Sequence, residues 1–147
     1  MSKPRIIVGI SGASGAIYGV TLLDMLREVE VETHLVVSKS GELTLSAETG
    51  LKLKDMEIRA DHIHPVKNVG ATIASGSFKT MGMIIAPCSI RTASEISSGI
   101  TASLLTRAAD VVLKERRRLA LMVRETPLHL GHLRTLTQLA EMGAIIA

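Results

Sequence analysis

The chain has 147 residues, 46% of them hydrophobic, which is enough for one domain with a substantial buried core. Its 17 basic and 14 acidic side chains leave a net charge of +3, and it has one tyrosine, one phenylalanine and no tryptophan. With so few aromatic platforms for stacking bases, we expect no nucleic-acid partner. No stretch approaches the roughly 18 apolar residues that cross a bilayer, so we expect no membrane span and a cytoplasmic location.

The first half of the chain alternates between strand and helix patterns. Residues 5–11 form an apolar, β-branched run that predicts a buried strand, and residues 15–29 carry apolar side chains at helical spacing. Residues 33–37 predict a second strand and residues 39–48 a second helix. A polar stretch follows, and the segment around residues 60–66 predicts a short strand.

The alternation continues in the second half. Residues 82–86 predict a strong strand that the proline after them ends. Helices are predicted over residues 89–98 and 102–116. Residues 119–123 predict a further strand and residues 129–141 a further helix.

The last predicted strand begins within residues 143–147. Strands separated by helices at this spacing predict an α/β fold, a doubly wound parallel sheet in a three-layer Rossmann or flavodoxin-like sandwich. We expect residues 1–147 to form a single domain. In such folds ligands bind outside the carboxyl ends of the strands, so the turns after the strands are where a site is expected.

The first strand ends in a turn of small residues, Ser11 to Gly15, directly before a helix. Small residues let a ligand approach the backbone closely, and the start of a helix offers unpaired N–H groups that suit a phosphate. The turn lacks the G-x-G-x-x-G pattern of dinucleotide-binding proteins and the Gly-Lys-Ser/Thr of a P-loop. Phosphate binding and a plain strand-to-helix turn therefore both stay open.

Hydroxyl groups or an arginine follow four of the predicted strands, at Ser11 to Ser14, Ser38, Cys88 to Thr92 and Arg124 to Thr126. Any single Ser or Thr here can be explained as the cap of the following helix. Four such turns on one edge of the sheet would instead suit a phosphorylated planar cofactor. For all four together we favour a binding site.

Six long motifs occur in order along essentially the whole chain: Gly9–Gly19, Glu32–Val36, Ala74–Phe78, Ala86–Ser89, Leu105–Arg117 and Val123–Leu128. In these motifs the chain resembles the UbiX flavin prenyltransferase family. The resemblance implies a metal-independent transferase that attaches a dimethylallyl group to N5 and C6 of reduced FMN. The product would be the prenylated-FMN cofactor of UbiD-type decarboxylases, in ubiquinone biosynthesis or aromatic acid breakdown.

The resemblance also implies partners. They are FMN, dimethylallyl phosphate, a UbiD-type decarboxylase that receives the product, and further copies of the chain. The copies would form a homo-oligomer with shared sites, for which a dodecamer is one candidate. No metal is implied.

The resemblance assigns roles to particular positions. The implied FMN-binding residues are Gly12, Ala13, Ser14, Ser38, Ser89, Ile90, Arg91, Thr92 and Arg124. The implied catalytic residues are Ser14, Glu48 and Glu125, and the implied substrate-phosphate residues are Arg107, Lys114 and Arg124. Fixed cations would stabilise the leaving phosphate, and a carboxylate such as Glu125 would act as the base that takes the proton from C6.

The sequence departs from the family pattern in two places, and two alternative functions stay open. Arg91 stands where the family often has lysine, which keeps the charge but changes its shape. A C-terminal strand and helix segment with part of the substrate pocket is expected to be missing. The alternatives are an FMN-dependent cysteine decarboxylase-type flavoprotein, which typically has Pro-Ala-Ser-Ala-Asn-Thr at residues 87–92, and a non-catalytic flavin-binding fragment.

The remaining reactive side chains are interpreted as structural. His62 and His64 lie in a polar segment and are expected on the surface. His129 and His132 are expected to cap a helix or lie exposed rather than bind a metal. Cys88 follows a strand and is expected to be a small buried thiol.

Overall fold

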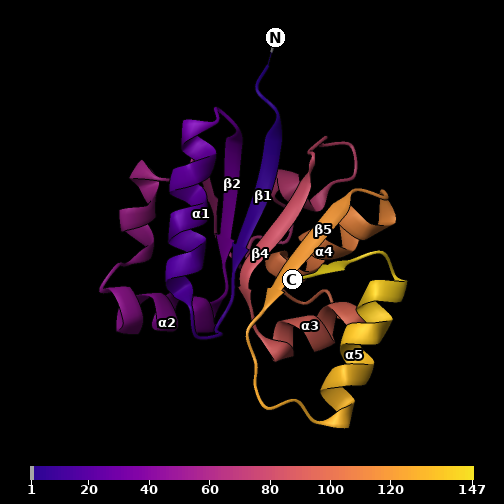
Figure 1. Cartoon of the computed structure of the whole chain (residues 1–147). Coiled ribbons are helices and arrows are strands. Elements are labelled where there is room, and N and C mark those ends of the chain that lie inside the picture. The colour runs from indigo at the N-terminus through magenta and orange to yellow at the C-terminus, as the bar shows by residue number, and fades with distance from the viewer. Residues whose placement is uncertain (1) are drawn as a thin grey trace.

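The computed structural model describes residues 2–147 and arranges them as a parallel sheet with helices on both faces (Figure 1). The strands are β1 (Arg5–Ile10), β2 (Glu32–Val37), β3 (His62–His64), β4 (Gly82–Cys88), β5 (Arg118–Val123) and β6 (Ile145–Ile146). The α-helices are α1 (Ala16–Glu28), α2 (Lys39–Thr49), α3 (Ile90–Ser97), α4 (Leu104–Lys114) and α5 (Leu130–Glu141). Two short 3-10 helices are η1 (Leu53–Ile58) and η2 (Thr72–Ala74). The predicted doubly wound α/β fold is confirmed.

The strand order is β3-β2-β1-β4-β5-β6, and every pairing among these strands is parallel. The chain winds outward from β1 in one direction and from β4 in the other, so the order reverses between these two central strands. At such a reversal the following helices lie on opposite faces of the sheet, which opens a crevice at the carboxyl ends of the strands. The fold therefore places the candidate site beyond β1 and β4.

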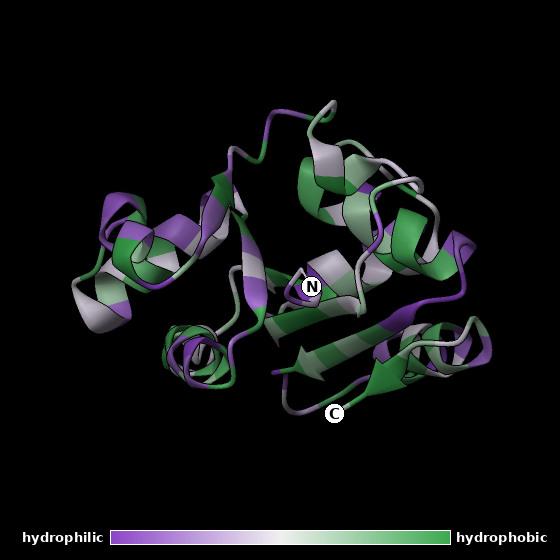
Figure 2. Cartoon of the chain, turned by 90° about the horizontal axis from the view of Figure 1, so that it is seen from above, coloured by the Kyte–Doolittle hydropathy of each residue, from purple (hydrophilic) through white to green (hydrophobic). Residues whose placement is uncertain are grey.

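The core has one layer on each face of the sheet. One layer packs α1 and α2 against Ile6, Val8 and Ile10 of β1, and the other packs α3, α4 and α5 against β4 and β5. Figure 2 shows the apolar central strands between the two helical layers. Strands buried on both faces read as continuous hydrophobic runs, which is why the central strands were predicted clearly.

The differences from the predicted elements have local causes. β4 continues through Pro87 to Cys88, with a shift of register against β5 between Ile85 and Cys88, so the prediction that the proline ends the strand was wrong. Proline lacks an N–H donor, but its carbonyl still accepts a hydrogen bond. α4 ends at Lys114 instead of residue 116, because Arg116 adopts a left-handed φ of 57°. The two 3-10 helices were not predicted, since each is a short segment without a helical apolar period.

No helix within residues 2–147 combines the length and the apolar character that crossing a membrane would need.

At Gly19 the backbone of α1 lies directly against β4. A Cβ atom added there would lie 2.5 Å from the carbonyl oxygen of Ala86 and 2.7 Å from the side chain of Ile10. We expect Gly19→Ala to lower the free energy of unfolding by about 1–3 kcal/mol, because backbone atoms cannot move aside cheaply. Urea unfolding would measure this. As a control, a Cβ atom added at Gly70 would meet only the Asn68 side chain, at an ordinary contact distance of 3.8 Å, so Gly70→Ala should change stability by less than about 0.5 kcal/mol. Equal effects of the two substitutions would contradict the argument.

Candidate active site

The buried hydroxyl of Ser11 joins the ends of the two central strands. Its Oγ donates to the carbonyl oxygen of Pro87 at 2.9 Å and accepts from the backbone N–H of Ser89 at 2.7 Å. The backbone N–H of Ser11 also donates to Pro87, at 3.2 Å. These bonds hold the turn after β1 directly against the turn after β4.

The outer turns are attached to the same edge by backbone hydrogen bonds. The N–H of Ser38, after β2, donates to the carbonyl of Ile10 at 2.9 Å, and the N–H of Arg124, after β5, donates to the carbonyl of Cys88 at 3.2 Å. The four hydroxyl- or arginine-bearing turns thus converge at one edge of the sheet. This is the arrangement that a shared site requires.

Glu48, from the last turn of α2, caps the N-terminus of α1. Its carboxylate accepts from the N–H groups of Gly15 at 2.9 Å and Ala16 at 3.0 Å, and from the hydroxyl of Ser14 at 2.9 Å. The two backbone bonds, then Ser14 and the nearby charge of Arg124, hold the pKa of Glu48 below its usual 4.5. Glu48 is therefore an ionised acceptor, and these two amides of the first turn are already occupied.

Arg124 lies beside this turn and stacks on Tyr18 of α1. The guanidinium carbon is 5.1 Å from the centre of the Tyr18 ring, and a Cβ atom added at Gly15 would lie 3.7 Å from it. Both side chains are exposed, so the pair can contact a ligand. Tyr18 belongs to the Gly9–Gly19 motif, but the sequence alone assigned it no role. Its position about one helical turn after the small-residue turn could have indicated that it lies near the site.

A second helix N-terminus at this edge differs from the first. Ser89 caps α3 by accepting from the N–H of Thr92 at 3.1 Å, and its hydroxyl lies 3.0 Å from that of Thr92. A hollow of about 300 Å³ opens beside it. Its lining comprises Ser38, Lys39, Val66, Lys67, Arg91, Thr92, Glu95, Ala102, Ser103, Leu105 and Thr106. No acidic side chain among the described residues caps this helix start as Glu48 caps α1.

Three of the predicted cofactor residues, Ser38, Arg91 and Thr92, line this hollow together. The hollow also contains Lys39 and Lys67, two cations that sequence reasoning did not single out. Lys39 directly follows a predicted residue, but Lys67 lies in a loop, and only the tertiary structure brings it here.

The other predicted residues occupy varied positions. Gly12 and Ala13 form the first turn, Ile90 begins α3 and packs partly into the core, and Glu125 is exposed next to Arg124. The side chain of Arg91 is 84% exposed, and its Nε forms an ion pair with Glu95 Oε1, one helical turn further along α3, at 3.6 Å.

The two predicted substrate-phosphate residues of α4 lie at different distances from the hollow: Arg107 directly follows Thr106, which lines it, whereas Lys114 does not reach it. Arg107 is half-buried on α4, while Lys114 is at the last residue of that helix, about 15 Å along the axis from its start at the carboxyl edge. Within one chain Lys114 is therefore not brought to the hollow.

The structure confirms the structural interpretations of Cys88 and His129 but corrects that of His64. Cys88 is fully buried, and burial raises the pKa of its thiol to about 12, as expected of an inert thiol. His129 caps α5 by accepting from the N–H of His132 at 3.2 Å, which confirms the capping interpretation. The surface interpretation of His62 and His64 needs correction: both lie in β3, and although His62 is exposed, His64 is half-buried against His34.

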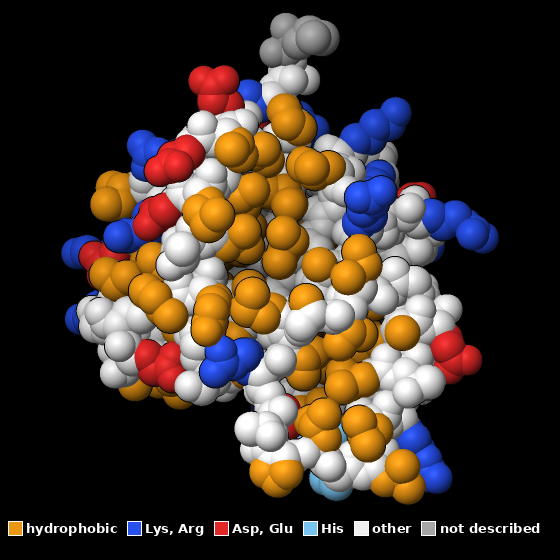
Figure 3. Space-filling view, viewed as in Figure 1, with side chains coloured by type: hydrophobic (Ala, Val, Ile, Leu, Met, Phe, Trp, Pro, Cys, Tyr) orange, Lys and Arg blue, Asp and Glu red, His pale blue; other side chains and the backbone are white. Residues whose placement is uncertain are grey.

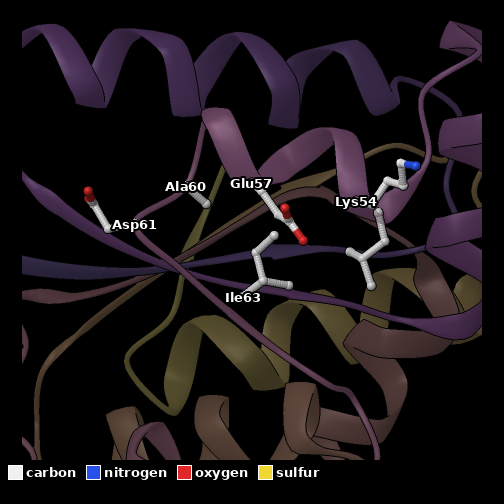
Figure 4. A pocket seen from close by; sticks show the side chains of 6 residues that line it. Lys54, Glu57, Ala60, Asp61 and Ile63 are labelled. Carbon is white, nitrogen blue, oxygen red and sulfur yellow. The ribbon is translucent and has the colours of Figure 1, made fainter.

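A separate groove of about 570 Å³ runs along η1 and β3 (Figure 4). Lys54, Glu57 and Ile63 line it, and none of the predicted site residues does. Asp61, at one end, is engaged by the N–H of Thr33 at 2.8 Å. The groove lies on the opposite side of β2 from β1 and is distinct from the carboxyl-edge hollow.

Comparison with known proteins agrees with this geometry. The Flavoprotein family model matches residues 1–147. The flavin prenyltransferase UbiX of Escherichia coli (strain K12) is 62% identical over 143 residues, 97% of this chain and 76% of that protein. The corresponding protein of Neisseria meningitidis is 56% identical over 97% of this chain and 75% of its own length. The chain belongs to the UbiX-like flavin prenyltransferase family. It is therefore a flavoprotein and a transferase.

Solved structures resemble this chain at two levels of similarity. AnUbiX (PadA1), in complex with FMN and dimethylallyl pyrophosphate, has a TM-score of 0.97 at 45% identity, covering 99% of this chain and 77% of that one. The cysteine decarboxylase TvaF matches with a TM-score of 0.80 but only 14% identity, over 99% of this chain and 90% of that one, and so shares the fold alone. The family comparison favours prenyl transfer over the cysteine decarboxylase alternative.

The capping role of Glu48 gives a pH-dependent signature. We expect NMR titration of the Glu48 carboxyl to give a pKa below 4.5, and Ser14→Ala to raise it, because one donor to the carboxylate is lost. A depressed folded pKa means that the stabilisation is complete above about pH 4.5 and disappears as the pH falls through the folded value.

Ser77→Ala is the matched control, because Ser77 is hydrogen-bonded to Ser75 and not to Glu48. It should leave the Glu48 pKa unchanged. An unshifted pKa in Ser14→Ala would rule out the hydroxyl contact.

Proposed function

We propose that this family member attaches a dimethylallyl group to N5 and C6 of reduced FMN, forming the prenylated FMN used by UbiD-type decarboxylases. The observation that carries the proposal is the convergence of the turns after β1, β2, β4 and β5 on one edge. That edge combines a hydroxyl-lined, cationic hollow with a neighbouring patch of Ser14, Glu48 and Arg124.

The residues at this edge fit a flavin mononucleotide. Lys39, Lys67 and Arg91 give the hollow three cations against Glu95, and Thr92 adds a hydroxyl, so the phosphate belongs there, at the start of α3. The start of α1 is a poor phosphate site, because the ionised Glu48 would repel it. The ring end is then directed to the patch around Ser14 and Arg124.

The side chains near Ser14 and Arg124 have different roles in the proposed reaction. Bound reduced FMN supplies the nucleophilic carbon and nitrogen atoms. Arg124 contacts the departing phosphate and stabilises its charge, and its stacking on Tyr18 keeps it at the edge. Glu48 contributes a fixed negative charge beside Ser14. Glu125 is exposed at the end of β5, and its carboxylate accepts the proton that C6 loses.

A second copy of the chain completes the site in this proposal. Figure 3 shows a broad band of apolar side chains over the face where α1 lies next to β4 and β5. Large apolar side chains on these elements are exposed: Ile17 and Met25 of α1 are 53% and 60% exposed, and Ile145 of β6 is 49% exposed. Such a surface is typical of an interface between subunits. A relative from Escherichia coli O157:H7, 48% identical with a TM-score of 0.94 over 97% of this chain and 78% of that one, is dodecameric.

Lys114 is exposed at the end of α4 and Arg107 is half-buried one turn after its start, and we assign both to the substrate phosphate of a neighbouring copy. The product passes to a UbiD-type decarboxylase, and both proteins are placed in the cytoplasm. These assignments follow the family resemblance.

A single-turnover assay tests the proposed prenyl transfer. The purified chain, incubated with reduced FMN and dimethylallyl phosphate, should yield a flavin heavier by one five-carbon unit in mass spectrometry. Bound but unmodified FMN would contradict prenyl transfer and support the non-catalytic flavin-binding alternative. Absence of bound flavin would contradict the cofactor site.

Glu125→Gln separates binding from chemistry. We expect FMN to bind with unchanged affinity, because the hollow is intact, while product formation slows by about 10²-fold or more through loss of the base. Flavin absorbance after gel filtration and single-turnover rates measure the two effects. Glu141→Gln, an exposed change at the end of α5, is the control and should alter neither. An unchanged rate in Glu125→Gln would remove this carboxylate from the mechanism.

A further inference from the structure

Three imidazoles and a carboxylate gather on one face of β2 and β3, away from the hollow that the proposed function uses. Residues two apart on a strand share a face, so Glu32 and His34 project together from β2, and His62 and His64 from β3. The parallel register sets His34 opposite His62 and Val36 opposite His64. β3 is the outermost strand in the order, so the cluster lies at the margin of the sheet.

The distances within the cluster are short. His34 Nε2 lies 2.7 Å from Glu32 Oε2, and His34 Nδ1 lies 2.9 Å from His64 Nε2. One ligand atom each from Glu32, His34 and His62 can be chosen so that all lie within 4.8 Å of one another. His34 is buried, Glu32 is partly buried and His62 is exposed, which leaves access from solvent.

We propose that Glu32, His34 and His62 bind a divalent transition metal, with Zn²⁺ as the preferred ion. Two imidazole nitrogens and one carboxylate oxygen are a common zinc ligand set that leaves one position for water. Zinc bonds of about 2.0–2.2 Å separate ligand atoms by about 3.3 Å, so Glu32 must move outward slightly from His34. His62, whose ring stacks on that of His34 at 4.5 Å, must turn its nitrogen inward, and its exposure permits this.

His64 acts as the partner that orients the buried ligand. Coordination through His34 Nε2 requires the proton of that ring to be on Nδ1, which then donates to His64 Nε2. His64 in turn carries its own proton on Nδ1. Each ring stays neutral with one proton, so metal binding changes the tautomers but not the number of protons on this pair.

Arg5 limits the affinity of the site. Its Nε lies 3.2 Å from the same Glu32 oxygen, and this cation competes with the metal for the carboxylate. The guanidinium also lies over the ring of Phe78, at 4.4 Å from the centroid, and can keep that contact when the metal binds. A bound metal would link the three-residue strand β3 to β2 and stabilise the margin of the sheet. The proposed site lies away from the hollow, and the family resemblance implies no metal for prenyl transfer.

Zinc titration of the chelator-treated full chain tests the site, in competition with a chromogenic zinc indicator. We expect one equivalent of Zn²⁺ per chain and a higher Tm in its presence, because the ion binds the folded state preferentially. His62→Ala should weaken binding at least tenfold, and because His62 is exposed the circular dichroism spectrum should not change. Co²⁺ in place of Zn²⁺ should show visible absorption that His62→Ala loses.

His132→Ala is the matched control. It removes one member of the other stacked histidine pair, His129 and His132, whose ring centroids lie 3.5 Å apart at the start of α5. Zinc affinity should be unchanged in this variant. Equal affinity in His62→Ala and the unaltered chain, or a loss confined to His132→Ala, would overturn the proposal, as would the absence of zinc uptake by the unaltered chain.

Discussion

The arrangement of the site depends on the buried hydroxyl of Ser11. It bonds to Pro87 and Ser89 and so ties the ends of β1 and β4 at the point where the strand order reverses. In a doubly wound sheet this reversal creates the crevice in which ligands bind. A buried hydroxyl must be paired, and here its pairing fixes two ligand-bearing turns relative to each other. The hollow beside α3 and the turn before α1 keep their relative places because of this junction.

The two helix N-termini at this edge look alike in sequence but are chemically different. The start of α1 is neutralised by Glu48, a residue 32 positions away from Ala16, whereas α3 is capped only by its own Ser89. An anion is therefore directed to α3 and the lysines around it, and the negative charge of Glu48 is kept beside Ser14. In the function that we propose, this asymmetry separates a phosphate end of the FMN-binding edge from a reactive end.

Much of the fold could be predicted from the chain. Strands such as β1 and β4 are buried on both faces, so their apolar runs are long enough to recognise, and the helices between them imply parallel pairing. The full length of β4 could not be predicted, because it depends on backbone contacts such as the one between Pro87 and Ser11. The short elements η1 and η2 could not be predicted because they have no helical apolar period. His64 was misplaced for the same reason: its burial comes from His34, on another strand.

The sequence by itself determined the α/β class, the family and the set of turns that carry hydroxyls and arginine, because these follow from local periodicity and motif. The tertiary structure alone decided that the four turns meet, that Glu48 closes the start of α1, and that Lys67 joins Arg91 at the hollow. It also decided that Lys114 lies at the far end of α4, and that three histidines and Glu32 gather on β2 and β3. Each of these depends on contacts between segments remote in sequence, which only sheet register and helix packing bring together.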